Sequence, residues 1–262
     1  MLIMALIYHD VSRTADDREA GADSESGADS AENWYRVRRD DFAAHLEAIE
    51  AASISPSLVT EPAGVNAVFL TFDDGDESAI TTVAPMLESR GWRGHFFIVT
   101  GWIGTPGFVR DDDIRTLCSR GHVVGSHSHT HPIMTELSDA EIREEWRTSR
   151  ELLEDIVNVP IETASIPMGY YNDRIGRLAI ESGYRHVFTS EPWLRPRQLN
   201  AHTIYGRFSI RRATTSDSVG ALCSFSRTVI ARESVAWRSR KALKTVLGSR
   251  YEDVRRYVIN RR

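Results

Sequence analysis

The sequence predicts an α/β protein in which a parallel sheet curves into a barrel, followed by a helical C-terminal tail. Short apolar runs alternate with amphipathic segments along most of the chain, as in repeated βα units. About seven such units fit a barrel better than an open sheet, although spacing alone does not decide between them. The acidic and histidine-rich motifs also follow predicted strands, where both architectures place their sites.

The segment from Val68 to Phe72 is the predicted central strand, because it is apolar and rich in β-branched and aromatic residues. It ends in Asp73, Asp74 and Gly75. Adjacent carboxylates at the end of a core strand are costly to desolvate unless their charge is used. One would act as a base and the other would bind a cation. The alternative is that an aspartate caps a helix beginning near Ser78.

The remaining elements are predicted from apolar periodicity and from the residues at their ends. Besides residues 65–72, strands are expected at residues 2–8, 95–99, 122–125, 163–166, 184–189 and 203–210. Helices are expected at residues 40–52, 78–90, 111–120, 138–157 and 172–182. Asp40 is the expected cap of the first helix, and Ser138 with Glu141 forms a capping-box pattern.

A second polar motif, from Gly125 to Pro132, contains three alternating histidines. His127 and His131 are four residues apart, so one helical turn would place both imidazoles on one face, with His129 directed away. Together with Asp74 they form an N,N,O donor set that leaves a coordination position open, as in catalytic zinc sites. The alternative is a polar turn with pH-sensitive side chains.

Composition narrows the function classes. The chain has 262 residues, 41% of them hydrophobic, which allows one large core or two small ones. Its formal net charge is −5, and we expect no nucleic-acid partner. Its two cysteines, Cys118 and Cys223, are too few for a disulfide framework. No basic leader, cleavage site or membrane-length apolar run is visible, so we expect a cytoplasmic protein.

We expect a barrel over residues 1–226 and a basic, helical extension over residues 227–262. Within the barrel, residues 13–33 lack an apolar period and are predicted to form a flexible acidic loop. The extension has 11 Lys and Arg against 3 Asp and Glu, and an amphipathic pattern built on four residues: Val235, Leu243, Val246 and Leu247. A second short helix is expected at residues 251–259. The basic face would contact an anionic membrane at its inner, cytoplasmic side, or the extension would simply pack on the barrel.

The two polar motifs resemble the first two motifs of the polysaccharide deacetylases, the NodB-homology family that forms carbohydrate esterase family 4. The matching segments are Thr71 to Gly75 and His127-Ser128-x-x-His131-Pro132, and the resemblance extends over about residues 2–210. It implies a distorted (β/α)7 barrel and an N-acetylated glycan as partner. It also implies Asp73 as the base and a divalent metal held by three residues: Asp74, His127 and His131. Zinc is the expected metal, with Co²⁺, Ni²⁺ and Fe²⁺ as alternatives.

The third motif departs from the family pattern. Where the family has an arginine that orients the base, this chain has Ser165, and Met168 stands at an aromatic position. We expect Arg207 to orient the base instead; the alternative is that it is a surface arginine. The backbone N–H of Met168 is the candidate oxyanion donor. Tyr170 and Trp193 are candidate substrate contacts, the latter by stacking on a sugar ring.

A leaving amine needs an acid, and the family's late Leu-x-His motif is not found, because His202 stands one residue out of pattern. The segment from Leu6 to Val11 instead resembles the N-terminal strand of the poly-N-acetylglucosamine deacetylase branch. In that branch the motif order is permuted and the equivalent histidine is the acid, so the resemblance assigns this role to His9. The alternative is a strand-end histidine bonded to a carbonyl.

These observations favour a metal-dependent hydrolase that removes N-acetyl groups from an amino sugar in a glycan or a lipid-linked glycan precursor and releases acetate. Two alternatives remain open. The first is a related barrel hydrolase acting on a small amide such as a ureide. The second is a non-catalytic glycan-binding protein that has kept the fold. Release of acetate from N-acetylglucosamine oligomers separates the first function from both alternatives.

Overall fold

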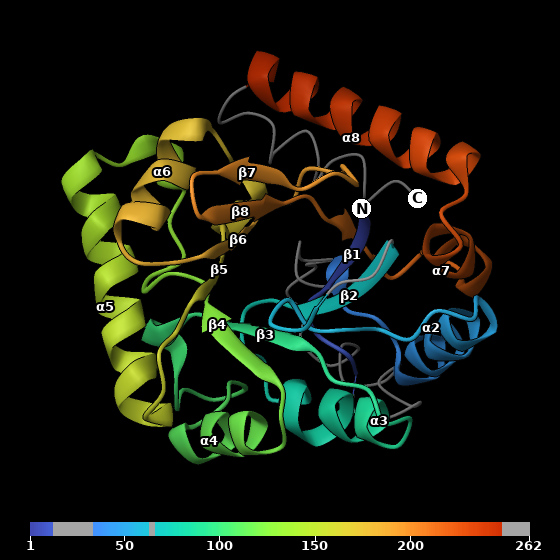
Figure 1. The fold of residues 1–262 in the computed structure, drawn as a ribbon, viewed down its shortest axis with the longest axis horizontal. Coiled ribbons are helices and arrows are strands. Elements are labelled where there is room, and N and C mark those ends of the chain that lie inside the picture. The colour runs from blue at the N-terminus through green and yellow to red at the C-terminus, as the bar shows by residue number, and fades with distance from the viewer. Residues whose placement is uncertain (13–33, 63–65, 248–262) are drawn as a thin grey trace, which may run out of the picture.

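The computed structural model describes residues 1–12, 34–62 and 66–247. The strands lie at the centre of the molecule and the helices surround them (Figure 1). The acidic loop predicted at residues 13–33 and the short helix predicted at residues 251–259 both lie outside the described residues.

The described strands form one sheet, with the bounds β1 (Leu2–Tyr8), β2 (Asn66–Phe72), β3 (His95–Ile98), β4 (Val123–Ser126), β5 (Thr163–Ser165), β6 (His186–Phe188), β7 (Arg197–Leu199), β8 (His202–Tyr205) and β9 (Phe208–Ser209). Their order in the sheet is β7-β8-β6-β5-β4-β3-β2-β1-β9. Only β7 and β8 pair antiparallel; the other neighbours are parallel. The carboxyl ends of the parallel strands therefore meet at one end of the sheet.

The chain itself closes this sheet into a barrel. β8 lies beside one edge of the strand order and β9 forms the other edge, yet only Gly206 and Arg207 separate them in sequence. The path from Tyr205 to Phe208 spans at most about 11 Å, so the two edges must approach each other. Across this seam the backbone N–H of Ile3 donates to the carbonyl of Leu194 at 2.7 Å. The predicted barrel architecture is confirmed.

Alternation along the strands separates two packed regions. Met4 and Leu6 on β1 belong to the larger core cluster, which includes residues of the surrounding helices. Ile3 and Ala5 belong instead to a smaller cluster inside the barrel, which is filled largely by aromatic rings. Within it the ring of Phe188 lies 4.8 Å from that of Tyr205, centroid to centroid. Closely packed apolar side chains inside the barrel thus support the carboxyl ends of the strands.

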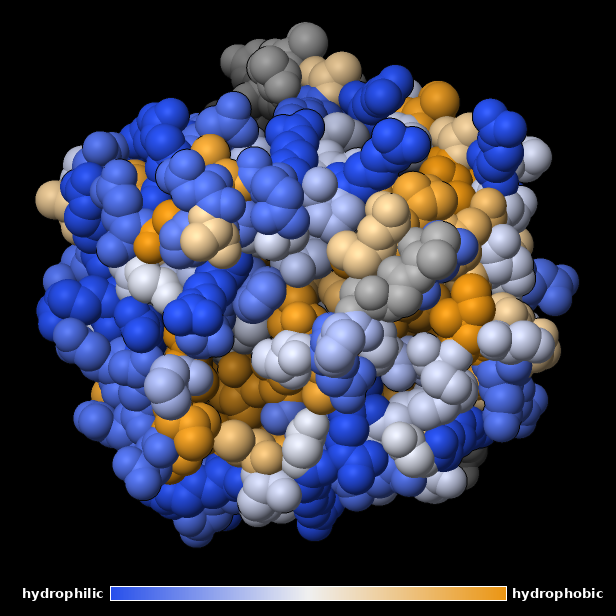
Figure 2. Space-filling model, in the orientation of Figure 1, coloured by the Kyte–Doolittle hydropathy of each residue, from blue (hydrophilic) through white to orange (hydrophobic). Residues whose placement is uncertain are grey.

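The helices have the bounds α2 (Arg39–Ala51), α3 (Ala84–Glu88), α4 (Asp111–Ser119), α5 (Asp139–Val157), α6 (Asp173–Glu181), α7 (Ser216–Cys223) and α8 (Arg227–Leu247). Short helical turns are η1 (Ala79–Val83), η2 (Thr100–Trp102), η3 (Met134–Glu136) and η4 (Pro167–Gly169). The predicted capping box is confirmed: Ser138 and Glu141 bond each other's backbone N–H at the start of α5. Hydrophilic side chains cover the outer side of α5 (Figure 2).

Most predicted elements lie within two residues of their observed bounds, but three details were wrong. Asp40 lies within the first turn of α2, where it complements the helix dipole, and Arg38 is the N-cap. The helix predicted at residues 78–90 begins as the π-helical turn η1, because Pro85 lacks the backbone N–H that a continuous α-helix needs. The strand predicted at residues 203–210 is broken at the barrel seam, because β8 pairs with β6 whereas β9 pairs with β1. β7 and α7 were missed altogether.

α8 confirms a helix at the start of the basic extension. Its side chains Val229 and Ile230 pack against the larger core cluster, and the ammonium of Lys241 contacts the carboxylate of Glu191. Val235, which was predicted to lie on the apolar face, is 61% exposed. Within the described residues, no helix combines the length and the apolarity that a bilayer crossing requires.

Candidate active site

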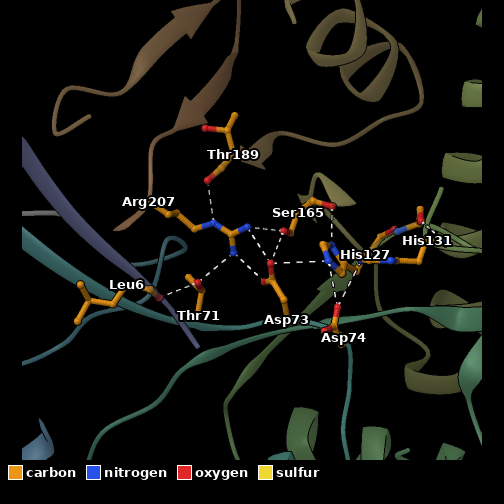
Figure 3. Close-up of polar contacts among 11 residues, drawn as sticks. Leu6, Thr71, Asp73, Asp74, His127, His131, Ser165, Thr189 and Arg207 are labelled. Carbon is orange, nitrogen blue, oxygen red and sulfur yellow. Dashed lines mark hydrogen bonds and ion pairs between the residues drawn. The ribbon is translucent and has the colours of Figure 1, made fainter. Parts of the chain in front are cut away.

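Asp73 and Asp74 enter one pocket because the backbone reverses between them. Phe69, Thr71 and Asp73 occupy successive interior positions of β2 and its continuation, which leaves Asp73 only 4% exposed. Asp74 has a φ of 76°, in the left-handed region that few non-glycine residues adopt. This reversal turns the second carboxylate toward the histidine motif, beside the first (Figure 3). Neither aspartate is the helix cap of the alternative interpretation, because Asp76 accepts the Ser78 N–H.

The triad Asp74, His127 and His131 comes together as predicted, but not through a helical turn. Ser128 and His131 have φ values of 66° and 61°, so the segment after β4 is an irregular turn. The ring centroids of the two histidines lie 4.9 Å apart. Glu145 on α5 holds this turn by accepting the backbone N–H groups of His129 and Thr130, both at 2.8 Å. His129 itself contacts the hydroxyl of Thr100, outside the triad.

The geometry of the triad fits a divalent cation. The Nε2 atoms of His127 and His131 lie 3.4 and 3.5 Å from Oδ1 of Asp74, and the three ligand atoms lie within 4.8 Å of one another. A tetrahedral site with bonds of about 2.0–2.1 Å places its ligand atoms about 3.4 Å apart. Oδ1 of Asp74 is buried and makes no hydrogen bond of ordinary geometry with any described residue. The Nδ1–H of His127 donates to the carbonyl of Ser165 at 2.9 Å, which leaves Nε2 as the nitrogen available to a cation.

Burial and neighbouring charges set the protonation of the triad. Burial raises the pKa of Asp74, but the close approach of His127 and the charges of His9 and His131 lower it well below the usual range. Burial and the nearby His127 lower the pKa of His131 to about 4. Burial likewise lowers the pKa of His127, but the carboxylates of Asp73 and Asp74 outweigh it and the net shift is upward. An ionised Asp74 and a neutral His131 are the forms that bind a cation.

Arg207 lies at the centre of the site, so the alternative of a surface arginine is wrong: the residue is 0% exposed. Its Nη1 and Nη2 donate to Oδ1 and Oδ2 of Asp73 at 2.7 and 2.9 Å, a bidentate pair. The other three N–H groups donate to the hydroxyls of Ser165 and Thr71 and to the carbonyl of Thr189, at 2.6 to 3.0 Å (Figure 3). The full donor capacity of the guanidinium is therefore satisfied.

This network keeps Asp73 ionised. Burial raises the pKa of Asp73, but the charges of Arg207 and His127 and the hydrogen bonds from Arg207 outweigh burial and lower it. The hydroxyl of Ser165 also donates to Oδ2 at 3.0 Å, while Nε2 of His127 lies 3.7 Å from the same oxygen. A fixed carboxylate thus lies directly beside the three possible metal ligands, in position to accept a proton.

His9 follows β1 at this same end of the barrel. Its charge lowers the pKa of both Asp73 and Asp74, and its ring lies 4.6 Å from that of Tyr35. Its Nδ1 is buried and makes no hydrogen bond with the described residues. His202, by contrast, begins β8 at the opposite end of the barrel and contacts the Tyr184 carbonyl through Nδ1 at 3.0 Å, so it cannot replace His9.

The roles of three further predicted residues stay predictions. Met168 lies in η4 directly after β5, with a φ of 58° and 46% exposure, and Tyr170 follows this turn. Trp193 packs in the barrel seam: a Cβ on Gly206 would lie 2.5 Å from its ring, and the guanidinium of Arg197 lies 4.1 Å from the ring centroid.

Sequence reasoning missed several residues that hold the site together. Thr71 and Thr189 support Arg207, and Ser165 was noted only as the substitute for an arginine. Trp102 packs against His131 with the two rings tilted at 45° and their centroids 5.1 Å apart. Strand alternation could have placed Thr71 beside Asp73, because both occupy interior positions. No local pattern marks the others.

Residues 60–187 match the polysaccharide deacetylase family model. Among curated proteins, the chain is 28% identical over 130 residues to the peptidoglycan-N-acetylmuramic acid deacetylase PdaA of Bacillus subtilis, covering 47% of this chain and 46% of PdaA. It is also 28% identical over 126 residues to an uncharacterized 30.6 kDa protein of Geobacillus stearothermophilus, with 47% and 46% covered. The match spans less than half the length of these relatives.

Solved structures agree on the fold. The deacetylase PplD of Streptococcus pyogenes, in complex with acetate, matches with a TM-score of 0.69 at 19% identity, covering 83% of this chain and 96% of PplD. IcaB from Ammonifex degensii matches with a TM-score of 0.67 at 20% identity, covering 85% and 97%. At these identities the likeness establishes the architecture.

Proposed function

The chain carries a polysaccharide deacetylase domain of the NodB-homology type, and from this premise we propose that it is a metal-dependent N-deacetylase. Its substrate would be an acetylated amino sugar in a glycan or a lipid-linked glycan precursor, and its products acetate and a free amine. The observation that carries the proposal is the placement of Asp73, an ionised and fully oriented carboxylate, directly beside the triad of possible metal ligands.

Asp74, His127 and His131 would hold the metal. Two imidazole nitrogens and one carboxylate oxygen suit zinc best, and Co²⁺, Ni²⁺ or Fe²⁺ would also accept this donor set. When bound, a divalent cation would polarise the acetamide carbonyl and make the attacking water more acidic.

Asp73 is the proposed base. It would accept the proton of the attacking water, and Arg207 would hold both carboxylate oxygens in place while it does so. The hydroxyl of Ser165 supports one of these oxygens, so only small displacements of the base are possible. This arrangement favours catalysis over the non-catalytic alternative, because a pure binding protein has no need for an ionised, oriented carboxylate.

His9 is the proposed acid. An amine is a poor leaving group, so cleavage of the C–N bond requires a proton donor. His9 lies at the carboxyl end of β1 within the electrostatic reach of both aspartates. The backbone N–H of Met168 would stabilise the oxyanion that forms as water adds to the carbonyl. Tyr170 and Trp193 are the proposed substrate contacts.

The direct test is acetate release from N-acetylglucosamine oligomers by the zinc-loaded protein. We expect turnover by the wild type and none by Asp73→Asn, which cannot accept the proton but keeps every metal ligand. Ureides serve as competing substrates in parallel reactions. Turnover of a ureide without acetate release from any glycan would favour the amidohydrolase alternative, and binding without turnover of either would favour the glycan-binding one.

We also propose reversible contact between the basic extension and an anionic membrane surface, on its cytoplasmic side, where a lipid-linked substrate would be held. The exposed side chains Arg232 and Arg238 on α8 support this proposal, since basic residues near such a surface contribute about 1 kcal/mol each. Co-sedimentation with anionic liposomes should be lost at high salt and weakened by Arg238→Glu. Protein that stays in the supernatant at low salt would refute the contact.

A further inference from the structure

The two histidines of the triad are held in different ways, although both imidazoles lie beside Asp74 (Figure 3). His127 directly follows β4, and its backbone N–H donates to the carbonyl of Ile98 on β3 at 2.8 Å, so the sheet fixes its backbone. His131 lies at the far end of the irregular turn at residues 128–131. The position of its imidazole therefore depends on the shape of this turn.

The turn adopts a costly backbone conformation. Ser128 and His131 both have positive φ values, in the left-handed region that is unfavourable for residues other than glycine. Such conformations persist only where the surrounding contacts impose them. On the carbonyl side of the turn, η2 supplies two contacts: the N–H of Thr100 donates to the carbonyl of Ser128 at 3.2 Å, and that of Gly101 to the carbonyl of His129 at 2.8 Å.

The carboxylate of Glu145 on α5 holds the N–H side of the turn. Its Oε2 accepts the backbone N–H groups of His129 and Thr130, both at 2.8 Å, and its Oε1 accepts the hydroxyl of Thr130 at 2.7 Å. One side chain thus makes three hydrogen bonds to the two residues that directly precede His131. Hydrogen bonds to a charged acceptor are stronger than those between neutral groups, so this contact constrains the turn strongly.

The helix that carries Glu145 is itself firmly placed. The next residue, Trp146, is 0% exposed. One helical turn further on, the hydroxyl of Ser149 lies 2.7 Å from that of Ser126, the last residue of β4. Glu145 and Ser149 therefore contact the chain on either side of His127, which fixes the helix relative to the turn.

We propose that Glu145 is a positioning residue for the metal ligands, because it holds the turn in the shape that keeps His131 beside Asp74. The inference rests on the proposed metal-dependent function and adds a determinant of metal affinity. Without these three hydrogen bonds the turn would adopt other conformations, and zinc binding would have to order it, at a cost in affinity. Residues that hold metal ligands in place typically change metal affinity by about 10–100-fold when they are replaced.

Two substitutions at Glu145 separate its position from its charge. Glu145→Asp keeps the charge but shortens the side chain by about 1.5 Å, so the carboxylate no longer reaches the turn. Glu145→Gln loses the charge but keeps the reach: its amide oxygen can accept both N–H groups, and its amide nitrogen can donate to the hydroxyl of Thr130. Glu144→Asp is the matched control, because Glu144 is the preceding residue on α5 and its 62% exposed side chain contacts Arg147 instead.

Zinc affinity is measured on the full chain by competition with a chelator, and urea unfolding of the zinc-free variants reports their stability. We expect Glu145→Asp to bind zinc about 10–100-fold more weakly than the wild type. Glu145→Gln and Glu144→Asp should bind zinc nearly as tightly as the wild type. A purely structural role would lower the stability of Glu145→Asp and leave its zinc affinity unchanged.

Unchanged zinc affinity in Glu145→Asp, or weaker binding by Glu145→Gln than by Glu145→Asp, would overturn the positioning role. If Glu145→Asp does not fold, Glu145→Gln decides alone, since a tenfold loss of affinity there would assign the effect to charge. Acetate release from N-acetylglucosamine oligomers is measured separately. The expected order of zinc affinities without turnover would remove the deacetylase function alone, and turnover with equal zinc affinities would remove the positioning role alone.

Discussion

Arg207→Met is the substitution for which we predict the largest loss of stability. It removes the guanidinium and keeps a side chain of similar length. Asp73, which is 4% exposed in the wild type, then loses its bidentate partner. Breaking a buried ion pair in this way costs about 3–5 kcal/mol, because an uncompensated charge is left in the interior. The free energy of unfolding should fall by this amount at pH 7.

The same substitution should move the acid limb of the pH–rate profile. Burial raises the pKa of Asp73, and the charge of Arg207 is a main cause of its net lowering. Without Arg207 the pKa rises, so the ionised base is present only at higher pH and activity is lost first at the acid end. A stability loss with an unchanged acid limb would refute the assignment of Arg207 to the base.

Urea unfolding in a double-mutant cycle with Asp73→Asn measures the interaction energy between Arg207 and Asp73 directly. Each single variant leaves one buried partner unmatched, so the double variant should be little worse than either alone. Arg147→Met is the surface control. Arg147 contacts Glu144 and Glu151 at 2.7 Å, but its side chain is 54% exposed, so solvent screens these pairs and we expect little loss of stability. Additive effects of the two buried substitutions would contradict the pairing.

Three further predictions concern the metal, the acid and a buried histidine. The first set of variants is Asp74→Ala, His127→Ala and His131→Ala, each of which removes one proposed zinc ligand and should abolish stoichiometric zinc in elemental analysis. Zinc retained by one of these variants would show that its residue is not a zinc ligand. His9→Ala should reduce turnover of acetamides far more than that of acetate esters, whose leaving groups need less protonation; equal losses would assign His9 to structure or binding. Burial lowers the pKa of His95 to about 4 in the folded protein. As the pH falls, His95 therefore becomes protonated at a higher pH in the unfolded chain than in the folded one. The fold should therefore lose roughly 2–3 kcal/mol between pH 7 and pH 4.5 through His95. In urea titrations His95→Gln should lose less stability over this range than the wild type, and an equal loss would refute the linkage.

The sequence by itself determined most of the secondary structure and the candidate metal ligands. Helix ends carry local signals, such as the capping box of Ser138 and Glu141, and strands carry apolar runs. The carboxyl ends of parallel strands meet at one edge, so Asp74 and the histidines could be placed together before their geometry was known. These inferences hold because each depends on neighbouring residues or on a general property of parallel sheets.

Only the tertiary structure decided how the proposed base, Asp73, is held. Arg207 and Asp73 are 134 residues apart, and they meet because the chain crosses the barrel seam at Gly206 and Arg207. Ser165 leaves room for the guanidinium and bonds it, which no pattern near residue 165 indicates. The positive φ of Asp74 and the irregular turn before His131 likewise arise from surrounding contacts. Such contacts follow from strand register and barrel closure, which depend on the packing of the whole chain and leave no periodicity in the local sequence.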